Sequence, residues 1–369
     1  MRVLSLALRD FRSYEAAEVA LGDELTVISG PNGAGKTNLL EALYFGCTGR
    51  SCRTANEREV VRFGAGATRV LVRSLAEDGP HETAVGFAPG QPKRLRVDGA
   101  GVERLLDVYT RPLVSVFLPD RLELVKGAPA PRRAHLDQLV AALWPGRAET
   151  RRAYGQALAQ RNALIARVRS GSGSRDALAT WDAQLARCGV ALMRDRGQAT
   201  ELIAEPARQI GASLGIEAGL SVTYRPRSHA VDAAELAAEL RERAEQDIER
   251  GFTAHGPHRD ELGLTLGALD LRAYGSQGQQ RIALLAVLLA EREVIAESRG
   301  APPVMLLDDV MSELDDLRRH ALIELLRAGN GQSVITTTDL EHVPGACDEG
   351  VVRMTIADGR VLEEAVATG

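Results

Sequence analysis

The chain has 369 residues, of which 45% are hydrophobic and 4% aromatic, and its formal net charge is −5. Its length predicts two domains, or one domain with a large insertion, and its net charge gives no overall nucleic-acid signal. The four cysteines form no C-x-x-C pair, and no apolar run approaches the roughly eighteen residues of a membrane span. These features exclude a disulfide-rich or membrane-spanning protein and predict a cytoplasmic protein with reduced thiols.

Strands are expected at residues 3–8, 17–21 and 25–29, and the N-terminus is interpreted as a first strand and not as a signal peptide. A helix is expected at 37–47. The segment between the third strand and this helix reads G-x-x-x-x-G-K-[ST], the phosphate-binding loop of ATP- and GTP-using proteins. The candidate cofactor-binding residues are those of this motif and the residue that follows it: Gly30, Pro31, Asn32, Gly33, Ala34, Gly35, Lys36, Thr37 and Asn38.

The composition of this loop predicts its chemistry. Glycines allow backbone N–H groups to surround phosphate oxygens, and the helix N-terminus adds partial positive charge. Lys36 is expected to reach the β- and γ-phosphates, and the Thr37 hydroxyl to bind magnesium. The chain has three lysines against 42 arginines, so a lysine here indicates selection for a compact ammonium. The alternative is a glycine-rich turn without a ligand.

The rest of the chain predicts a mixed α/β core interrupted by helices. A β-meander is expected at 69–76, 82–88 and 93–97, and a buried strand at 113–117. Residues 131–212 are expected to be mostly helical, with breaks at 145–146 and at the glycine-serine tract 170–174, and a helix is expected at 234–250. Strands at 262–266 and 269–272 and a long helix from Ser276 follow. We therefore predict an ATPase domain at 1–120 and 251–369 and a helical insertion at 121–250.

Charge is distributed unevenly along the chain. Residues 121–175 hold eleven Lys/Arg against three Asp/Glu, a difference of +8, whereas residues 232–261 hold nine acids against four bases, a difference of −5. This polarity predicts separate faces for an anionic polymer and for another partner. Solvated helix faces are the alternative. Four arginines are candidate phosphate contacts to duplex DNA, because aromatic residues for stacking single strands are scarce there: Arg132, Arg133, Arg151 and Arg152.

A second set of motifs completes an ATP site. Residues 304–309 form a buried strand that ends in Asp308, assigned to the magnesium, and Asp309, assigned to the attacking water. Residues 274–281 resemble the ABC-type signature. In that motif, Ser276, Gly278 and Gln279 would face the γ-phosphate held by a partner subunit. A capping box is the alternative for Ser276. Residues 312–315, ending in Asp315, look like the ABC D-loop, and Thr338 stands where these ATPases usually have histidine.

The chain resembles the RecF family of bacterial recombination mediators, which are ABC ATPases allied to SMC-like chromosome-maintenance proteins. Three stretches carry the resemblance beyond the ATP motifs: residues 10–15 (DFRSYE), 119–137 with its P-D-R-L-E-L-V-K-G-A-P core, and 255–262 (HGPHRDEL). It implies an ABC-type ATPase head with a mixed sheet and a helical lobe in place of the long SMC coiled coil. His135 stands where an aromatic residue is usual.

The resemblance also implies an activity. The expected protein binds ATP and magnesium, forms an ATP-dependent homodimer, and engages DNA at gaps or single/double-strand junctions. With RecR and RecO it would load RecA onto single-stranded DNA. Asp309 is one methylene shorter than the glutamate common at that position, and Thr338 cannot act as a histidine does, so slow ATP hydrolysis is expected. DNA is expected to stimulate it, and Lys36, Asp309 and Ser276 are the expected catalytic residues.

Three alternatives stay open. The first is a regulatory module in which ATP is only a structural ligand. The second is an ABC transporter subunit, which is disfavoured because no glutamine occurs in residues 117–120 and no membrane partner is indicated. The third concerns His255 and His258, which could suggest a metal site, although no cysteine or paired acid stands at zinc spacing. Hydrogen-bonding, nucleotide-sensing or structural roles are preferred for these two histidines.

Overall fold

The computed structural model describes residues 1–118 and 122–366. The chain folds into two compact units. The first comprises Met1–Arg121, Ser213–Gly215 and Arg292–Gly369, and the second comprises Leu122–Ala212 and Ile216–Glu291. Predictions that involve Pro119, Asp120 and Arg121 lie outside the described residues.

The second unit continues further along the chain than the expected helical insertion. Residues 251–291, which we assigned to the ATPase domain, group with the helices because β10 (Glu261–Leu266) pairs antiparallel with β9 (Leu220–Arg225) and contacts α3 (Pro129–Leu143). Local sequence patterns do not report such pairings. The functional division at residue 251 stays a proposal.

The first unit contains two six-stranded sheets. One is antiparallel, with the order β2-β1-β4-β5-β6-β7, and the other has the order β15-β14-β3-β13-β12-β8, in which only β15 is antiparallel to its neighbour. Their strands are β1 (Arg2–Phe11), β2 (Tyr14–Ala20), β3 (Leu25–Ser29), β4 (Thr68–Ala76), β5 (Gly79–Phe87), β6 (Arg94–Val97), β7 (Ala100–Val102), β8 (Val114–Phe117), β12 (Val304–Leu307), β13 (Ser333–Thr337), β14 (Val352–Ala357) and β15 (Arg360–Val366).

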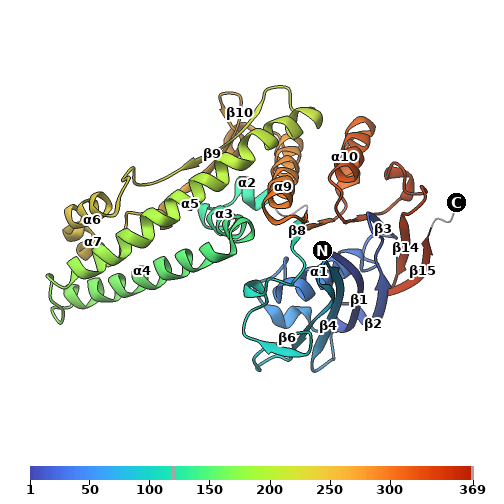
Figure 1. Cartoon of the computed structure of the whole chain (residues 1–369), viewed down its shortest axis with the longest axis horizontal. Coiled ribbons are helices and arrows are strands. Elements are labelled where there is room, and N and C mark those ends of the chain that lie inside the picture. The colour runs from blue at the N-terminus through green and yellow to red at the C-terminus, as the bar shows by residue number, and fades with distance from the viewer. Residues whose placement is uncertain (119–121, 367–369) are drawn as a thin grey trace. The chain divides into compact units, whose positions relative to one another are not determined.

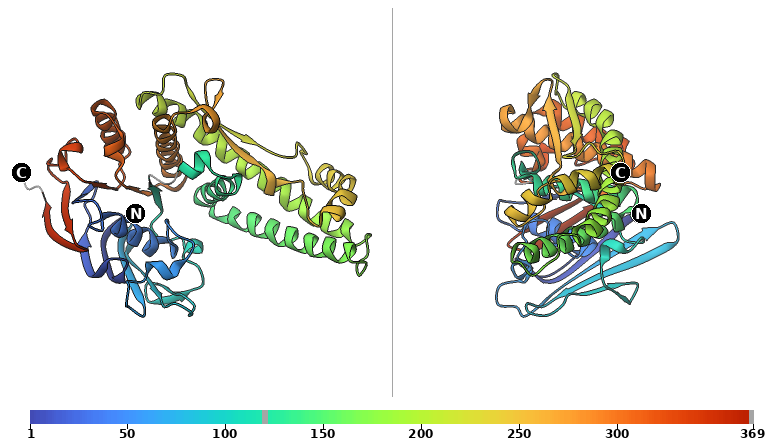
Figure 2. Two further views of the ribbon diagram at one scale, coloured as in Figure 1. Left: turned by 180° about the vertical axis from the view of Figure 1, so that it is seen from behind. Right: turned by 90° about the vertical axis from the view of Figure 1, so that its left-hand side faces the viewer.

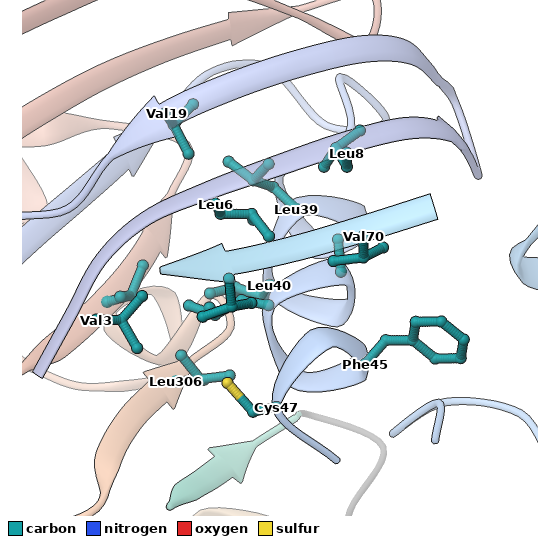
Figure 3. Packing of buried hydrophobic residues seen from close by; sticks show 14 of the residues in the cluster. Val3, Leu6, Leu8, Val19, Leu39, Leu40, Phe45, Cys47, Val70 and Leu306 are labelled. Carbon is teal, nitrogen blue, oxygen red and sulfur yellow. The ribbon is translucent and has the colours of Figure 1, made fainter. Parts of the chain in front are cut away.

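Helix α1 (Lys36–Thr48) packs against both of these sheets, and its apolar residues join them into one core (Figure 3). Leu39 and Leu40 of α1 pack with Leu6 of β1, and Cys47 at the other end of α1 belongs to the same cluster as Leu306 of β12. Every residue of β3 is buried, as expected for a central parallel strand. The strand and the helix that flank the phosphate-binding loop are therefore both fixed in the core. The first unit also contains α10 (Asp316–Ala328), η1 (Glu57–Val60), η2 (Leu105–Asp107), η6 (Val310–Glu313) and η7 (Leu340–His342).

The second unit is mostly helical. Its two long helices, α4 (Ala148–Arg169) and α5 (Leu178–Ser213), lie side by side and run antiparallel (Figures 1 and 2). The predicted glycine-serine loop connects them. Its other elements are α2 (Glu123–Lys126), α3, η4 (Pro145–Arg147), α6 (Ala233–Glu242), α7 (Ala244–Arg250), η5 (Pro257–Arg259), α8 (Leu271–Tyr274) and a three-stranded sheet of β9, β10 and β11 (Leu269–Asp270). Helix α9 (Gln277–Arg299) begins in this unit and ends in the first.

Two predicted elements of the second unit were wrong in detail. The helix expected at 234–250 is two helices, which break at Arg243, and the carbonyl of Leu240 just before the break accepts a hydrogen bond from Arg161 at 3.4 Å. The strand expected at 269–272 ends at Asp270, because this side chain accepts hydrogen bonds from the backbone of Arg272 and Ala273 and caps α8.

No helix in residues 1–118 and 122–366 is both long enough and apolar enough to cross a membrane.

Candidate nucleotide-binding site

The phosphate-binding loop has the backbone that its glycines predict. Gly30 and Gly35 have φ angles of 147° and 116°, which disfavour any residue with a side chain. A Cβ on Gly30 would lie 2.2 Å from the carbonyl oxygen of Ile356, and one on Gly35 would lie 3.0 Å from the hydroxyl of Tyr14. Tyr14 also donates a hydrogen bond to the Gly35 carbonyl at 3.0 Å. Neighbouring strands thus hold the loop tightly, and only glycine fits at these two points.

Lys36 lies within the loop that precedes it. Its Nζ donates hydrogen bonds to the carbonyls of Gly30 at 2.6 Å and Pro31 at 3.0 Å, and the residue is only 7% exposed. Burial lowers the pKa of Lys36, and the nearby carboxylates of Asp309 and Asp308 partly oppose that shift. The ammonium is therefore held at the centre of the loop by two carbonyl oxygens that a phosphate could replace.

The metal-binding residues predicted from the sequence meet in the structure. The Thr37 hydroxyl lies 2.9 Å from both carboxylate oxygens of Asp308, at the end of β12. A second hydroxyl, that of Thr336 on β13, donates to Asp308 Oδ1 at 2.8 Å. Burial raises the pKa of Asp308, and these two hydrogen bonds act in the opposite direction. No Lys or Arg among the described residues forms an ion pair with this buried carboxylate.

Asp309 has an unusual backbone and a free acceptor. Its φ of 45° lies in the left-handed region, which is uncommon for residues other than glycine. Its N–H donates to the Thr336 hydroxyl at 2.9 Å, and its carbonyl accepts from Ser312 at 2.8 Å. Its Oδ1 is buried without a hydrogen-bond partner in the described part of the chain. A buried acceptor of this kind is costly unless a ligand uses it.

The donor set fits magnesium. Mg²⁺ prefers hard oxygen ligands and is usually bound by one or two protein side chains together with substrate phosphates. The Thr37 hydroxyl and the buried Asp308 carboxylate supply such oxygens beside the phosphate-binding loop.

A polar cluster beside the loop was not predicted. Glu41 of α1 is fully buried and accepts two hydrogen bonds from the guanidinium of Arg12, at 2.9 and 2.7 Å. Arg53 donates to Asn38 at 2.9 Å, and Asn38 in turn donates to Ser13 at 2.9 Å. Asn38, predicted to bind the cofactor, is thus held by side chains from two other segments. Arg12 and Ser13 lie in the DFRSYE stretch, but no local pattern indicates their partners.

The signature residues are part of the second unit. Ser276 and Gln279 form a reciprocal capping box at the start of α9: the Gln279 N–H donates to the Ser276 hydroxyl at 3.2 Å, and the Ser276 N–H donates to Gln279 Oε1 at 2.9 Å. Ser276, Gly278 and Gln279 are all exposed on the surface of that unit. The capping role is therefore present, and a nucleotide contact in a partner subunit stays a prediction. Asp315 likewise caps α10 through the Arg318 N–H.

The four candidate DNA contacts differ in their surroundings. Arg132 is 3% exposed, and Glu261 accepts two hydrogen bonds from it, at 2.5 and 2.7 Å. This pairing disfavours the predicted phosphate contact, because the guanidinium is needed inside the unit. Arg133 is half-buried and donates to the Asp260 carbonyl at 3.0 Å. Arg151 and Arg152 of α4 have side chains that are 63% and 38% exposed.

The oppositely charged segments bind each other within the second unit. Arg161 is fully buried and donates to Asp182 and Asp247 at 2.7 Å each, and Arg175 pairs with Glu245 at 2.7 Å. With the Arg132–Glu261 pair, three of the eleven bases in residues 121–175 form ion pairs with acids of residues 232–261 in the described structure, so part of the expected polarity is internal charge pairing. The charges in these ion pairs are therefore not available to form the two oppositely charged faces that we expected.

The two histidines have structural hydrogen bonds. His255 Nε2 lies 2.5 Å from Glu239, and His258 lies between the Tyr154 hydroxyl at 2.7 Å and the Thr253 carbonyl at 2.9 Å. Burial lowers the pKa of His258 to about 4, so this imidazole is neutral at pH 7. Among the described residues no group of three or more His, Cys, Asp or Glu side chains could hold a metal ion.

Comparison with known proteins places this site in a family. A family model described as an AAA domain matches residues 5–83, which include the phosphate-binding loop. The DNA replication and repair protein RecF of Myxococcus xanthus (strain DK1622) is 38% identical over 380 residues, spanning 100% of this chain and 98% of that protein. RecF of Anaeromyxobacter dehalogenans (strain 2CP-C) is 40% identical over 376 residues, spanning 98% and 99%. The chain belongs to the RecF family.

Solved structures agree with this assignment. A structure of the recombination mediator protein RecF with ATP, from the RecFOR pathway, is 27% identical and superposes with a TM-score of 0.89 over 99% of this chain and 98% of that one. An SMC head bound to the C-terminal winged-helix domain of ScpA, 17% identical, shares the fold with a TM-score of 0.60 over 99% and 98%. The predicted ABC-type, SMC-like ATPase head fold is confirmed.

Proposed function

We propose that this RecF-family chain is an ATP-dependent DNA-binding recombination mediator. The observation that carries the proposal is the joining of Lys36, Thr37 and Asp308 in one site, in a chain that matches RecF proteins along their full length. ATP bound in this loop would displace the Lys36 ammonium from the carbonyls of Gly30 and Pro31. The same ammonium would then hold the β- and γ-phosphates.

Magnesium would be held by the Thr37 hydroxyl and the Asp308 carboxylate. When bound, it neutralises charge on the β- and γ-phosphate oxygens. Asp309 would accept a hydrogen bond from the attacking water through its free carboxylate oxygen, and its backbone is already fixed by Thr336. The shorter reach of an aspartate than of a glutamate supports slow hydrolysis.

We further propose that ATP closes a homodimer. Ser276 and Gly278 at the start of α9 would bind the γ-phosphate held by the other subunit, because backbone N–H groups and the helix dipole favour an anion there. Asp315 would lie beside the same nucleotide. The exposure of Gly278 and the ordered capping box at this helix end support the proposal.

The closed dimer would engage DNA at gaps or single/double-strand junctions and act with RecR and RecO to load RecA. Two observations support this proposal. The related RecF structure with ATP belongs to the RecFOR pathway, and α4 carries exposed arginines. Such contacts to phosphates would be independent of sequence and sensitive to salt.

The function is tested by nucleotide binding and turnover. Lys36→Ala should abolish ATP binding and ATP-dependent dimerisation, whereas Lys126→Ala, which removes an exposed lysine of the second unit, should change neither. Phosphate release by the wild-type chain should be slow and should rise when duplex DNA is added. Tight ATP binding with no phosphate release, with or without DNA, would instead support the regulatory-module alternative.

A further inference from the structure

Thr336 lies two residues before Thr338, in the segment 333–339 that stands in the place of the ABC switch strand, but no role was predicted for it. It lies on β13, beside β12, and is fully buried. Its hydroxyl donates a hydrogen bond to Asp308 Oδ1 at 2.8 Å and accepts one from the Asp309 N–H at 2.9 Å. Thr338, where related ATPases usually have histidine, is exposed two residues later. A single hydroxyl therefore bridges the two acids of the ATP site.

Both hydrogen bonds act on groups that need a partner. A hydroxyl has one proton, and in Thr336 this proton is committed to Asp308, so the oxygen lone pairs are left to accept from Asp309. The Asp309 backbone is left-handed, a conformation that persists only when the surrounding structure fixes it. The hydrogen bond from the Asp309 N–H to Thr336 and the one from Ser312 to the Asp309 carbonyl hold this backbone, which carries the Asp309 carboxylate.

We propose that Thr336 is a positioning residue that couples the magnesium-binding carboxylate of Asp308 to the water-binding carboxylate of Asp309. The proposal rests on the ATP site of the proposed function. Thr37 contacts the same carboxylate from α1, so two hydroxyl groups hold Asp308 from two sides. Outer hydrogen bonds of this kind fix the orientation of metal ligands.

The side chain beside it provides a matched control. Thr337 is equally buried, but its hydroxyl donates to the Asp339 carbonyl at 2.7 Å and accepts from the Asp339 N–H at 3.2 Å. Thr336→Val and Thr337→Val therefore remove the same atom from adjacent residues of one strand. Only the first removes a contact to Asp308 and Asp309.

The experiment compares ATP affinity with and without Mg²⁺. With a fluorescent ATP derivative in EDTA, Thr336→Val should bind as the wild type does, within about twofold. In a Mg²⁺ titration, the concentration that half-maximally increases ATP affinity should rise about tenfold or more, as for other outer-shell substitutions. Turnover at saturating ATP and Mg²⁺ should fall, Thr336→Ser should restore both values, and Thr337→Val should match the wild type.

An unchanged Mg²⁺ midpoint in Thr336→Val, or an equal shift in Thr337→Val, would overturn the proposal. If Thr336→Val does not fold, Thr336→Ala and Thr336→Ser give the same comparison, since only Ala lacks the hydroxyl. Failure of the proposed function is distinguishable: a wild type that binds ATP and Mg²⁺ without turnover would contradict hydrolysis, and the Mg²⁺ midpoints would still decide the role of Thr336.

Discussion

The hydroxyl oxygen of Thr37 lies 2.9 Å from both carboxylate oxygens of Asp308, 271 positions later in the chain. This contact joins the phosphate-binding loop to the acidic end of β12. It exists because β3 and β12 are parallel strands on either side of β13, so their carboxyl ends meet at the same edge of the sheet. Asp309 follows directly and supplies a carboxylate oxygen that is free among the described residues.

Asp309→Asn should slow phosphate release without preventing ATP binding. An amide cannot take a proton from water, and loss of a general base typically lowers the rate by about 10²–10⁴-fold. The ATP-bound dimer should therefore persist for longer, as measured by sedimentation after ATP addition. Asp348→Asn, which alters a surface carboxylate paired with Arg327, is the control and should turn over normally. Loss of ATP binding in Asp309→Asn would refute the role assigned to this residue.

Exchange of Arg151 and Arg152 for Gln should weaken DNA binding. A plot of log affinity against log salt concentration has a negative slope, and each lost phosphate contact makes this slope shallower by about 0.9. The double variant should therefore make the slope shallower by up to about 2. Arg208→Gln removes an exposed arginine of the same unit, which pairs with Glu205 on its own helix, and serves as the control. Affinity and salt slope are measured with a gapped duplex. An unchanged slope would place the DNA contacts elsewhere.

Arg161→Met should strongly destabilise the second unit. The substitution leaves the buried carboxylates of Asp182 and Asp247 without their shared cation, and removal of one partner from a buried pair costs about 3–5 kcal/mol. Urea unfolding measures the loss. Arg175→Met breaks an exposed pair with Glu245 and should leave the unfolding midpoint nearly unchanged. Equal effects of the two variants would contradict this account of the network.

Stability should fall in acid partly because of His258. Burial lowers its pKa from 6.5 to about 4 in the folded chain. Between these values the unfolded chain binds a proton that the folded chain does not, so the free energy of unfolding contributed by this group declines as pH falls from about 6.5 to about 4. His258→Gln should therefore lose less stability than the wild type over this window, as measured by denaturant unfolding. Parallel pH profiles would contradict the assignment.

Local sequence patterns indicated which segments meet at the candidate site. The spacing of residues 30–37 and the apolar strand that ends at Asp308 are visible without a structure, and the structure brings Thr37 and Asp308 into contact, while their roles toward ATP stay a prediction. Arg132 shows where such reasoning fails: its charge suggested DNA, but its partner Glu261 lies 129 positions away. The same limit hid Thr336, because only the pairing of β12 with β13 brings its hydroxyl to Asp308.

Sedimentation velocity with ATP, with ADP and without nucleotide tests the central claim of a shared ATP site most directly. The wild type should be dimeric only with ATP and Mg²⁺. Ser276→Arg should bind ATP as tightly but stay monomeric, because the bulky side chain would block the partner's γ-phosphate. Ser276→Ala loses the N-cap without adding bulk and should still dimerise. A wild type that remains monomeric when saturated with ATP, or a Ser276→Arg variant that dimerises normally, would contradict the claim.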